Sequence, residues 1–273
     1  MPELPEVETI RRVLRHNLIN ETILDIQLSY QPLLEKDSSY PISQLINRRI
    51  TDVLRRGKYL VFELDEALYW IVHLRMEGKF HLYDEKTLPT KHTHLTFETP
   101  HHYVHYLDTR KFSRMSVTND LSRYFEEKHL GLEPFDDVLT VDYLRNKFKN
   151  RTMALKGVLL DQSVIAGIGN IYADEILFLS KLHPESNPSL LDDSDLECII
   201  ENTKSVLSKA IDEGGTTIRS YTSSLGVTGR FQVSLNAYGR GGEMCLVCGE
   251  TMQKIKVVQR GTVFCEKCQR LVR

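Results

Sequence analysis

The hydrophobic and polar residues of this chain recur with two different periods. Near the start, Val7, Ile10 and Leu14 stand three or four positions apart, which predicts an amphipathic helix over residues 3–16. From about residue 22 to residue 117, apolar and polar residues alternate in short runs separated by turn residues or charged clusters. This part is typical of an all-β sandwich or barrel. We expect strands at 22–28, 59–64, 69–74, 79–83, 94–98 and 103–107.

Helical spacing returns in the second half of the 273-residue chain. The mixed, charged stretch 121–138 breaks the strand pattern, and we place a domain boundary there. Residues 214–242 are rich in Gly, Ser and Thr and predict a long loop, of a kind that is usually functional or disordered. The chain is therefore expected to be a two-domain α+β protein. The helices are expected at 141–148, 152–160, 170–181 and 192–213.

Four of the five cysteines form two C-x2-C pairs separated by 16 residues: Cys245, Cys248, Cys265 and Cys268. A two-residue spacer lets both thiolates of a pair point at one tetrahedral metal, so the spacing predicts one structural Zn²⁺. Four cysteine ligands leave no open position for water. Disulfides are less favoured, because the chain is expected to be cytosolic. Cys198 lies in a helical apolar pattern and is expected to be a buried small hydrophobe.

Charge is distributed unevenly along the chain. The net charge is −2, but residues 214–273 hold nine Lys/Arg and three Asp/Glu, a balance of +6, which leaves −8 for the remainder. A basic C-terminal quarter fits a polyanionic partner, although a solvated surface poor in acids would look the same. No segment reaches the roughly 18 apolar residues of a membrane span, and no secretory signal is evident. We expect a cytoplasmic enzyme or binding protein.

The first residues admit two interpretations. If the initiator methionine is trimmed, Pro2 becomes an N-terminal secondary amine beside the carboxylate of Glu3. An α-amino group titrates near ~8, against ~10.4 for lysine, so it is partly neutral and can attack a sugar aldehyde carbon. The resulting iminium is a strong electron sink. The alternative is a plain helix start, because Pro5 suits a first turn and Glu6 suits the positive end of the helix dipole.

Three further motifs have both a functional and an ordinary interpretation. The Gly-Ile-Gly turn before Asn170 could bind a phosphate at a helix start, or Asn170 could simply cap the helix. Met76, among charged residues at a strand end, could be an apolar wedge that unstacks bases or ordinary core filling. Arg110 and Phe112 share a face of a strand, where they could fill the space of an extruded base or form a core cation–aromatic pair.

Taken in order along the whole chain, these motifs resemble the bacterial formamidopyrimidine-DNA glycosylase family. The resemblance implies a β-sandwich domain with an N-terminal helix at 1–132, a helix–two-turn–helix domain at 133–227 and a β-hairpin zinc finger at 228–273. DNA would bind in the cleft between the domains. The motifs that carry it are MPELPEVET at the start, RRGKYL at 55–60, HLRMEGKF at 73–80, DTRKF at 108–112, AGIGNIYADE at 166–175, TTIRSY at 216–221, YGRGG at 238–242 and the four-cysteine finger.

The resemblance also implies catalytic roles. Pro2 would attack C1′ of the damaged nucleotide, Glu3 would transfer protons, and Glu6 would help to hold the nucleotide. Lys58 and Arg260, which we count with the catalytic group, would bind phosphates around the lesion.

Further roles concern DNA binding. His73 and Asn170 would bind phosphates as well. Met76, Arg110 and Phe112 would fill the gap left by the flipped base, with Arg110 facing the orphaned cytosine. Lys156 matches a lysine linked to lesion handling, and the 216–228 loop would close over the extruded base.

The function implied is that of a bifunctional DNA glycosylase and AP lyase. It would remove 8-oxoguanine and formamidopyrimidines from duplex DNA through a Pro2 Schiff base and then cleave the abasic strand by β,δ-elimination. We expect a monomer that binds damaged or abasic double-stranded DNA in the bacterial cytoplasm, at the nucleoid, with no membrane partner. Two alternatives stay open: the pyrimidine-directed sibling endonuclease VIII, which usually has glycine where this chain has Leu4, and a non-catalytic zinc-dependent DNA-binding protein.

Four residues depart from the family pattern. Ser113 stands where a glycine commonly follows the Arg-Lys-Phe triplet, which would stiffen that loop. Leu132 and Glu266 each replace a usual proline, and Gln259 replaces a usual glycine before Arg260. None of these removes a chemical group from the implied mechanism, so they bear on affinity rather than on reaction type.

Overall fold

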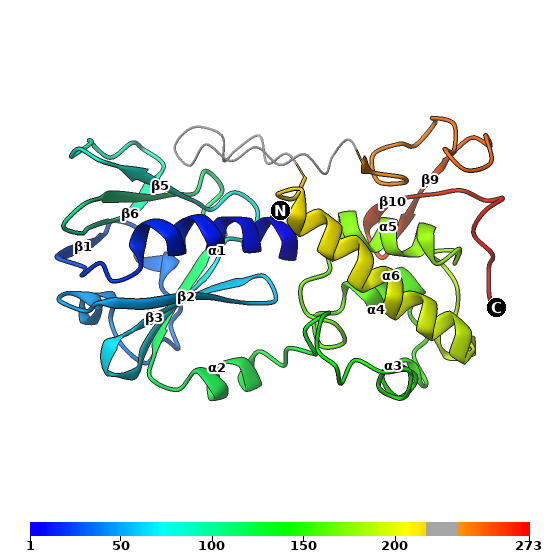
Figure 1. Ribbon diagram of the computed structural model, residues 1–273, viewed down its shortest axis with the longest axis horizontal. Helices are drawn as coiled ribbons and strands as arrows, with labels where there is room; N and C mark the ends of the chain where they lie inside the picture. The colour runs from blue at the N-terminus through cyan, green and yellow to red at the C-terminus, as the bar shows by residue number, and fades with distance from the viewer. Residues whose placement is uncertain (217–233) are drawn as a thin grey trace. The chain divides into compact units, whose positions relative to one another are not determined.

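The structure, a computed structural model, describes residues 1–216 and 234–273 (Figure 1). It contains two compact units. The first comprises Met1–Lys128 and Gly214–Gly229, and the second comprises His129–Glu213 and Arg230–Arg273. The predicted closing loop at 216–228 lies outside the described residues except for Thr216. The predicted three-domain boundaries stay a prediction.

Helix α1 (Leu4–Leu18) opens the first unit because its sequence suits each end of a helix. Pro5 lies in its first turn, where a missing N–H costs nothing, and Glu6 lies near the positive end of the helix dipole. One face buries Val7, Ile10 and Leu14 in the unit's main hydrophobic core. The helix predicted over 3–16 is therefore present, and it extends by half a turn.

Two four-stranded antiparallel sheets form most of the rest of this unit (Figure 1). Their inward side chains share one core with α1, in which Trp70 stacks on Phe62 and meets Phe80 and Phe97 edge-on. The predicted β-sandwich is confirmed, and the sequence missed two strands, β2 and β8. The first sheet has the order β1 (Asp25–Leu28), β6 (Thr93–Glu98), β7 (Tyr103–Leu107), β5 (Lys79–Tyr83), and the second β2 (Ile50–Arg56), β3 (Tyr59–Leu64), β4 (Leu68–His73), β8 (Arg114–Thr118).

The connections between the sheets position the candidate site. Strand β4 pairs with β8 in one sheet, and β5 pairs with β7 in the other. Both the β4–β5 turn and the β7–β8 turn therefore cross from one sheet to the other at the same end of the sandwich. The two segments that hold Met76 and Arg110 become neighbours through this topology, although more than thirty residues separate them in sequence.

Helices dominate the second unit. They surround a core that includes Leu144, Leu159, Tyr172 and Leu207.

The stretch 121–138 contains a short helix, α2, and is therefore not wholly irregular. The side chain of Asp120 caps this helix by accepting the backbone N–H of Arg123 in its first turn. α2 belongs to the first unit. The helices are α2 (Leu121–Glu127), α3 (Val141–Phe148), α4 (Leu155–Leu160), α5 (Asn170–Leu179) and α6 (Asp193–Asp212), with 3-10 turns at Gln31–Leu33, Ile42–Leu45, Asp65–Ala67 and Pro188–Leu190.

The second unit ends in a β-hairpin of β9 (Gln253–Val257) and β10 (Arg260–Phe264). Its turn residues Val258 and Gln259 have φ values of 42° and 64°. A glycine adopts such a left-handed conformation without strain, whereas a residue with a side chain is strained in it. Gln259, one of the departures from the family pattern, therefore adopts a strained conformation in the turn before Arg260. No helix within residues 1–216 and 234–273 is long and apolar enough to cross a membrane.

Candidate functional site

The N-terminal segment is held from two directions by Glu6. Its Oε2 accepts the backbone N–H of Glu3 at 2.8 Å, as in a capping box. Its Oε1 accepts both the N–H and the hydroxyl of Thr216, at 2.9 and 3.1 Å. Pro2 and Glu3 are buried at this helix start. Glu6 therefore fixes the helix start next to the predicted nucleophile, Pro2, and anchors residue 216. No sequence pattern predicts this second contact, because its partners are 210 residues apart.

A chain of polar contacts joins α1 to the turn that holds Lys58. Arg55 contacts Glu8 of α1 at 3.4 Å and donates to the carbonyl of Gly57 at 3.1 Å. Although burial alone would raise the pKa of Glu8, the neighbouring Arg11 and other arginines lower it below its ordinary value. The carboxylate thus stays charged and holds the turn. Lys58 is 6% exposed and immediately precedes β3.

His73 is held as a neutral ring. Its Nδ1 accepts the backbone N–H of Arg75 at 3.0 Å, and the edge of Tyr59, its cross-strand partner, lies 4.5 Å away between ring centroids. Burial, followed by the charges of Arg75 and Lys58, lowers the pKa of His73 to about 3. With Nδ1 used as an acceptor, Nε2 has the ring's one proton and can donate it, for example to a phosphate oxygen.

The three predicted gap-filling side chains lie in the two neighbouring crossover turns. Met76 is half-buried in the β4–β5 turn, and Phe112 is 49% exposed in the β7–β8 turn. The guanidinium of Arg110 lies over the Phe112 ring at 4.8 Å. An exposed aromatic ring with a guanidinium over its face offers a stacking surface and a cation, both of which suit nucleic-acid bases. The structure thus brings the three residues into one region of the first unit.

In the second unit, Asn170 begins α5 and lies beside the finger hairpin. Its Nδ2 donates to the carbonyl of Gly261 at 3.1 Å, next to Arg260. A cavity of about 340 Å³ opens here. The amides of the helix start favour an anion, and the Asp174 carboxylate in the lining is paired with Lys156. The predictions for Asn170 and Arg260 are therefore spatially consistent. The cavity is lined by Asn170, Asp174, Tyr238, Gly239, Gly241, Lys254, Gly261 and Val263.

Lys156 is completely buried beneath the same hairpin. Its Nζ lies 2.6 Å from Asp174, 2.8 Å from the Thr262 hydroxyl and 3.1 Å from the Gly261 carbonyl. Burial raises the pKa of Asp174 to about 6, against the opposing effect of Lys156. The lysine therefore supports the strand that follows Arg260. Its predicted part in lesion handling stays a prediction.

Some residues of this region escaped the sequence analysis. Glu175 accepts the backbone N–H groups of Asn236, Ala237 and Tyr238, each at 2.8 to 2.9 Å. It thereby fixes the segment that leads to the zinc finger. Lys254 lines the cavity, and the only available signal was its alternation with Lys256 along a strand.

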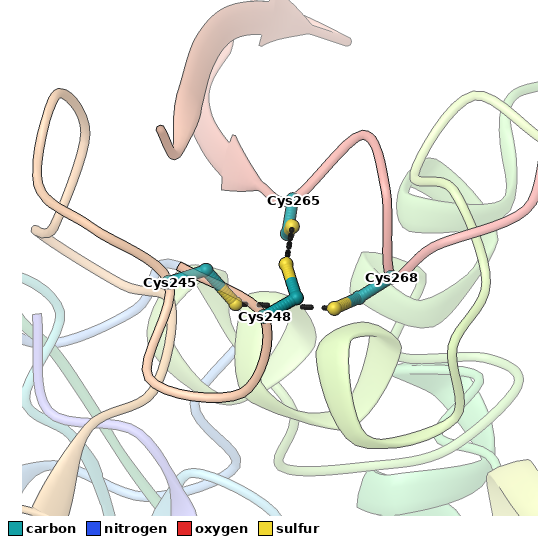
Figure 2. A group of neighbouring side chains, drawn as sticks. All are labelled: Cys245, Cys248, Cys265 and Cys268. Atoms are coloured by element: carbon teal, nitrogen blue, oxygen red, sulfur yellow. Dashed lines mark hydrogen bonds between the residues drawn. The ribbon is translucent and has the colours of Figure 1, made fainter. Parts of the chain in front are cut away.

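The four predicted zinc ligands converge. All four Sγ atoms lie within 4.8 Å of one another, and the closest pairs are Cys248–Cys265 at 3.5 Å and Cys245–Cys268 at 3.9 Å (Figure 2). A tetrahedral site with Zn–S bonds of about 2.3 Å requires sulfurs about 3.8 Å apart. The arrangement therefore fits Zn²⁺, which would hold the two knuckles together.

Comparison with known families covers most of the chain. The formamidopyrimidine-DNA glycosylase N-terminal domain matches residues 1–115, the H2TH domain of the same enzymes matches 130–222, and a zinc finger found in FPG and IleRS matches 242–271. The last match and the four clustered thiols together show that the protein has one structural zinc site.

Individual relatives are similar over the full length. A formamidopyrimidine-DNA glycosylase of Ligilactobacillus salivarius is 43% identical over 98% of this chain and 99% of its own. A crystal structure of a Lactococcus lactis FPG variant with DNA containing Fapy-dG has a TM-score of 0.92 and 39% identity, covering 98% of this chain and 100% of that one. A second Lactococcus lactis structure, with DNA containing an abasic site, has a TM-score of 0.90, 39% identity, and covers 98% and 99% of the two chains.

Proposed function

The chain belongs to the formamidopyrimidine-DNA glycosylase family, and from this premise we propose that it excises 8-oxoguanine and formamidopyrimidines from duplex DNA. It is an enzyme of DNA repair with glycosylase activity on damaged bases. The observation that carries the finer proposal is the anchored N-terminus, where Glu6 fixes the helix start that holds Pro2 and Glu3. A trimmed Pro2 amine would be placed by a buried hydrogen-bond network rather than by a mobile tail.

The proposed reaction starts with attack of the Pro2 nitrogen on C1′. A C–N bond forms, the bond from C1′ to the damaged base breaks, and the base leaves with a proton that Glu3 helps to supply. Ring opening of the sugar gives a cationic iminium. This electron sink acidifies the C2′ hydrogens, so β-elimination expels the 3′ phosphate and δ-elimination then expels the 5′ phosphate. Hydrolysis of the iminium returns the free amine. The protein is thus also proposed to be an AP lyase.

Phosphate binding is proposed for residues in both units. Lys58 and the neutral Nε2–H of His73 would bind backbone oxygens from the first unit, and Asn170 and Arg260 would do so from the second. Met76, Arg110 and Phe112 would occupy the space of the extruded nucleotide, with Arg110 facing the orphaned cytosine. We further propose that the protein acts as a monomer in the bacterial cytoplasm, in contact with the nucleoid.

Borohydride trapping tests this proposal, because the reagent reduces an iminium to a stable amine. On a duplex with an abasic site, Pro2→Gly should lower the trapped fraction on the order of a hundredfold or more, with DNA affinity largely kept. Pro5→Ala is the matched control, because it removes a proline of the same segment without touching the amine. Trapping of Pro2→Gly at the wild-type level, once removal of Met1 is confirmed, would disprove the role of Pro2.

A cleavage assay on two lesion duplexes, combined with trapping, separates two alternatives. A pyrimidine-directed enzyme would cleave a thymine-glycol duplex faster than an 8-oxoguanine duplex, and the proposed function requires the reverse. A non-catalytic zinc-dependent DNA-binding protein would retain both duplexes without cleaving or being trapped on either. Met76, together with the pair of Arg110 and Phe112 from a separate segment of the sequence, favours the purine-directed enzyme.

A further inference from the structure

Ser113 is fully buried in the turn between β7 and β8. Its hydroxyl contacts both its own turn and the neighbouring β4–β5 turn. These contacts therefore lie between the two segments that hold the gap-filling residues.

The hydroxyl of Ser113 lies between two acceptors on different turns. Its Oγ is 2.7 Å from Oδ2 of Asp108, in its own turn, and 3.0 Å from the carbonyl oxygen of Leu74, in the β4–β5 turn. The single hydroxyl proton is shared between a carboxylate and a carbonyl. The Leu74 carbonyl also accepts the N–H of Gly78 and so closes the turn that holds Met76.

Asp108 organises the other turn. It is fully buried and accepts the backbone N–H of Arg110 at Oδ1 and that of Ser113 at Oδ2, both at 2.9 Å. Burial would raise the pKa of Asp108, but hydrogen bonds from Ser113 and Arg110 lower it below its ordinary value. The β7–β8 turn thus surrounds a charged carboxylate. His94 Nε2 fixes the first residue of this turn by donating to the backbone carbonyl of Asp108 at 2.8 Å.

The two turns also pack against each other without spare room. A Cβ atom on Gly78 would lie 2.0 Å from the Tyr106 hydroxyl, 2.4 Å from Oγ of Ser113 and 2.7 Å from the Leu74 carbonyl oxygen. Any side chain at position 78 would therefore force the surrounding groups to shift. The contact between the turns is therefore tight on both sides of the Ser113 hydroxyl.

We propose that Ser113 is a positioning residue that ties the Met76 turn to the Arg110–Phe112 turn, so that the three gap-filling side chains enter DNA as one unit. This inference rests on the proposed function. It deepens that function, because a rigid unit places Arg110 at a fixed position against the orphaned base and so sharpens the choice of opposite base.

Three variants test the tie. Ser113→Ala removes the hydroxyl and keeps the stiffer backbone, whereas Ser113→Gly removes both. Ser116→Ala is the control, because Ser116 is a buried serine of the adjacent strand β8 and lies outside both turns. Loss of a hydrogen bond to a charged group corresponds to about a tenfold effect or more. We expect both Ser113 variants to lower kcat/KM on 8-oxoguanine paired with cytosine roughly tenfold and to shrink the preference for cytosine over adenine. Ser116→Ala should leave both unchanged.

A second measurement does not depend on activity. Hydrogen exchange at the Gly78 amide, bonded to the same Leu74 carbonyl, should become roughly tenfold faster in both Ser113 variants and stay unchanged in Ser116→Ala. Wild-type exchange and opposite-base preference in Ser113→Ala would overturn the tie, and so would a defect confined to Ser113→Gly, which would point to backbone stiffness. If the wild-type protein neither cleaves nor is trapped, the proposed function itself has failed.

Discussion

At the scale of single residues, the site depends on protonation states that neighbours impose. His73 is the clearest case, because a backbone N–H occupies Nδ1 and leaves Nε2 as the donor. A protonated ring would bind a phosphate more strongly through charge, but it would also have to keep its charge while buried beside Arg75 and Lys58. The neutral ring is therefore a permanent donor, and its proposed contact with DNA should be insensitive to pH near neutrality.

His73 should accordingly stay neutral, with its proton on Nε2, from pH 8 down to pH 5. Its folded pKa of about 3 lies below the ordinary 6.5, so the unfolded state binds the extra proton between these values. The contribution of this group to the free energy of unfolding is therefore fully present above pH 6.5, and it is lost as pH falls toward 3. Long-range ¹H–¹⁵N spectra of the imidazole check this, with His73→Gln to assign the signal. A ring that protonates near pH 6.5 would refute it.

At the scale of elements, the finger hairpin rests on a buried ion pair. Lys156 of α4 and Asp174 of α5 meet beneath β10 and contact the strand through Thr262 and Val263. The sequence could predict both helices, because local spacing determines them. It could not predict the pair, since Lys156 and Thr262 are 106 residues apart and neither stands in a pattern that marks it as buried.

Removing one partner of this pair should be costly. Lys156→Met leaves the Asp174 carboxylate buried and unpaired, and we expect the free energy of unfolding to fall by about 3 to 5 kcal/mol. Adding Asp174→Asn removes the uncompensated buried charge and should recover most of the lost free energy of unfolding. Urea denaturation of the zinc-loaded full chain measures both. A single variant as stable as the wild type, or a double variant no better than the single one, would show that the pair does not support the hairpin.

At the scale of the whole molecule, the sequence predicted the type of structure in each region but not the hydrogen bonds between residues far apart in the chain. The β-sandwich, the helical region and the cysteine finger follow from period and spacing, which are local. The missed strand β2 has irregular alternation, with buried Ile50 and Val53 three positions apart across a register shift. The missed contacts of Glu6 with Thr216 and of Glu175 with the 236–238 segment join distant parts of the chain, so no local pattern encodes them.

The uneven charge of the molecule leads to a last prediction. Because residues 214–273 hold a balance of +6 against −8 elsewhere, DNA binding should depend on this quarter and weaken with salt. The logarithm of the binding constant should fall linearly with the logarithm of salt concentration, by about 0.9 for each phosphate neutralised. Removing zinc with a chelator should release the hairpin and flatten this slope by at least about 1, the contribution expected of Arg260 alone.

Fluorescence anisotropy with an abasic duplex at several salt concentrations measures the slope for the zinc-loaded protein, the chelated protein and Arg260→Ala. Restored zinc is the control, and it should return the wild-type slope because the four thiols need only the metal to reassemble. Arg260→Ala should lose about one unit of slope while its zinc stays bound. A slope that survives chelation unchanged would mean that the phosphates are neutralised outside the finger, and the zinc finger would then have no part in neutralising DNA.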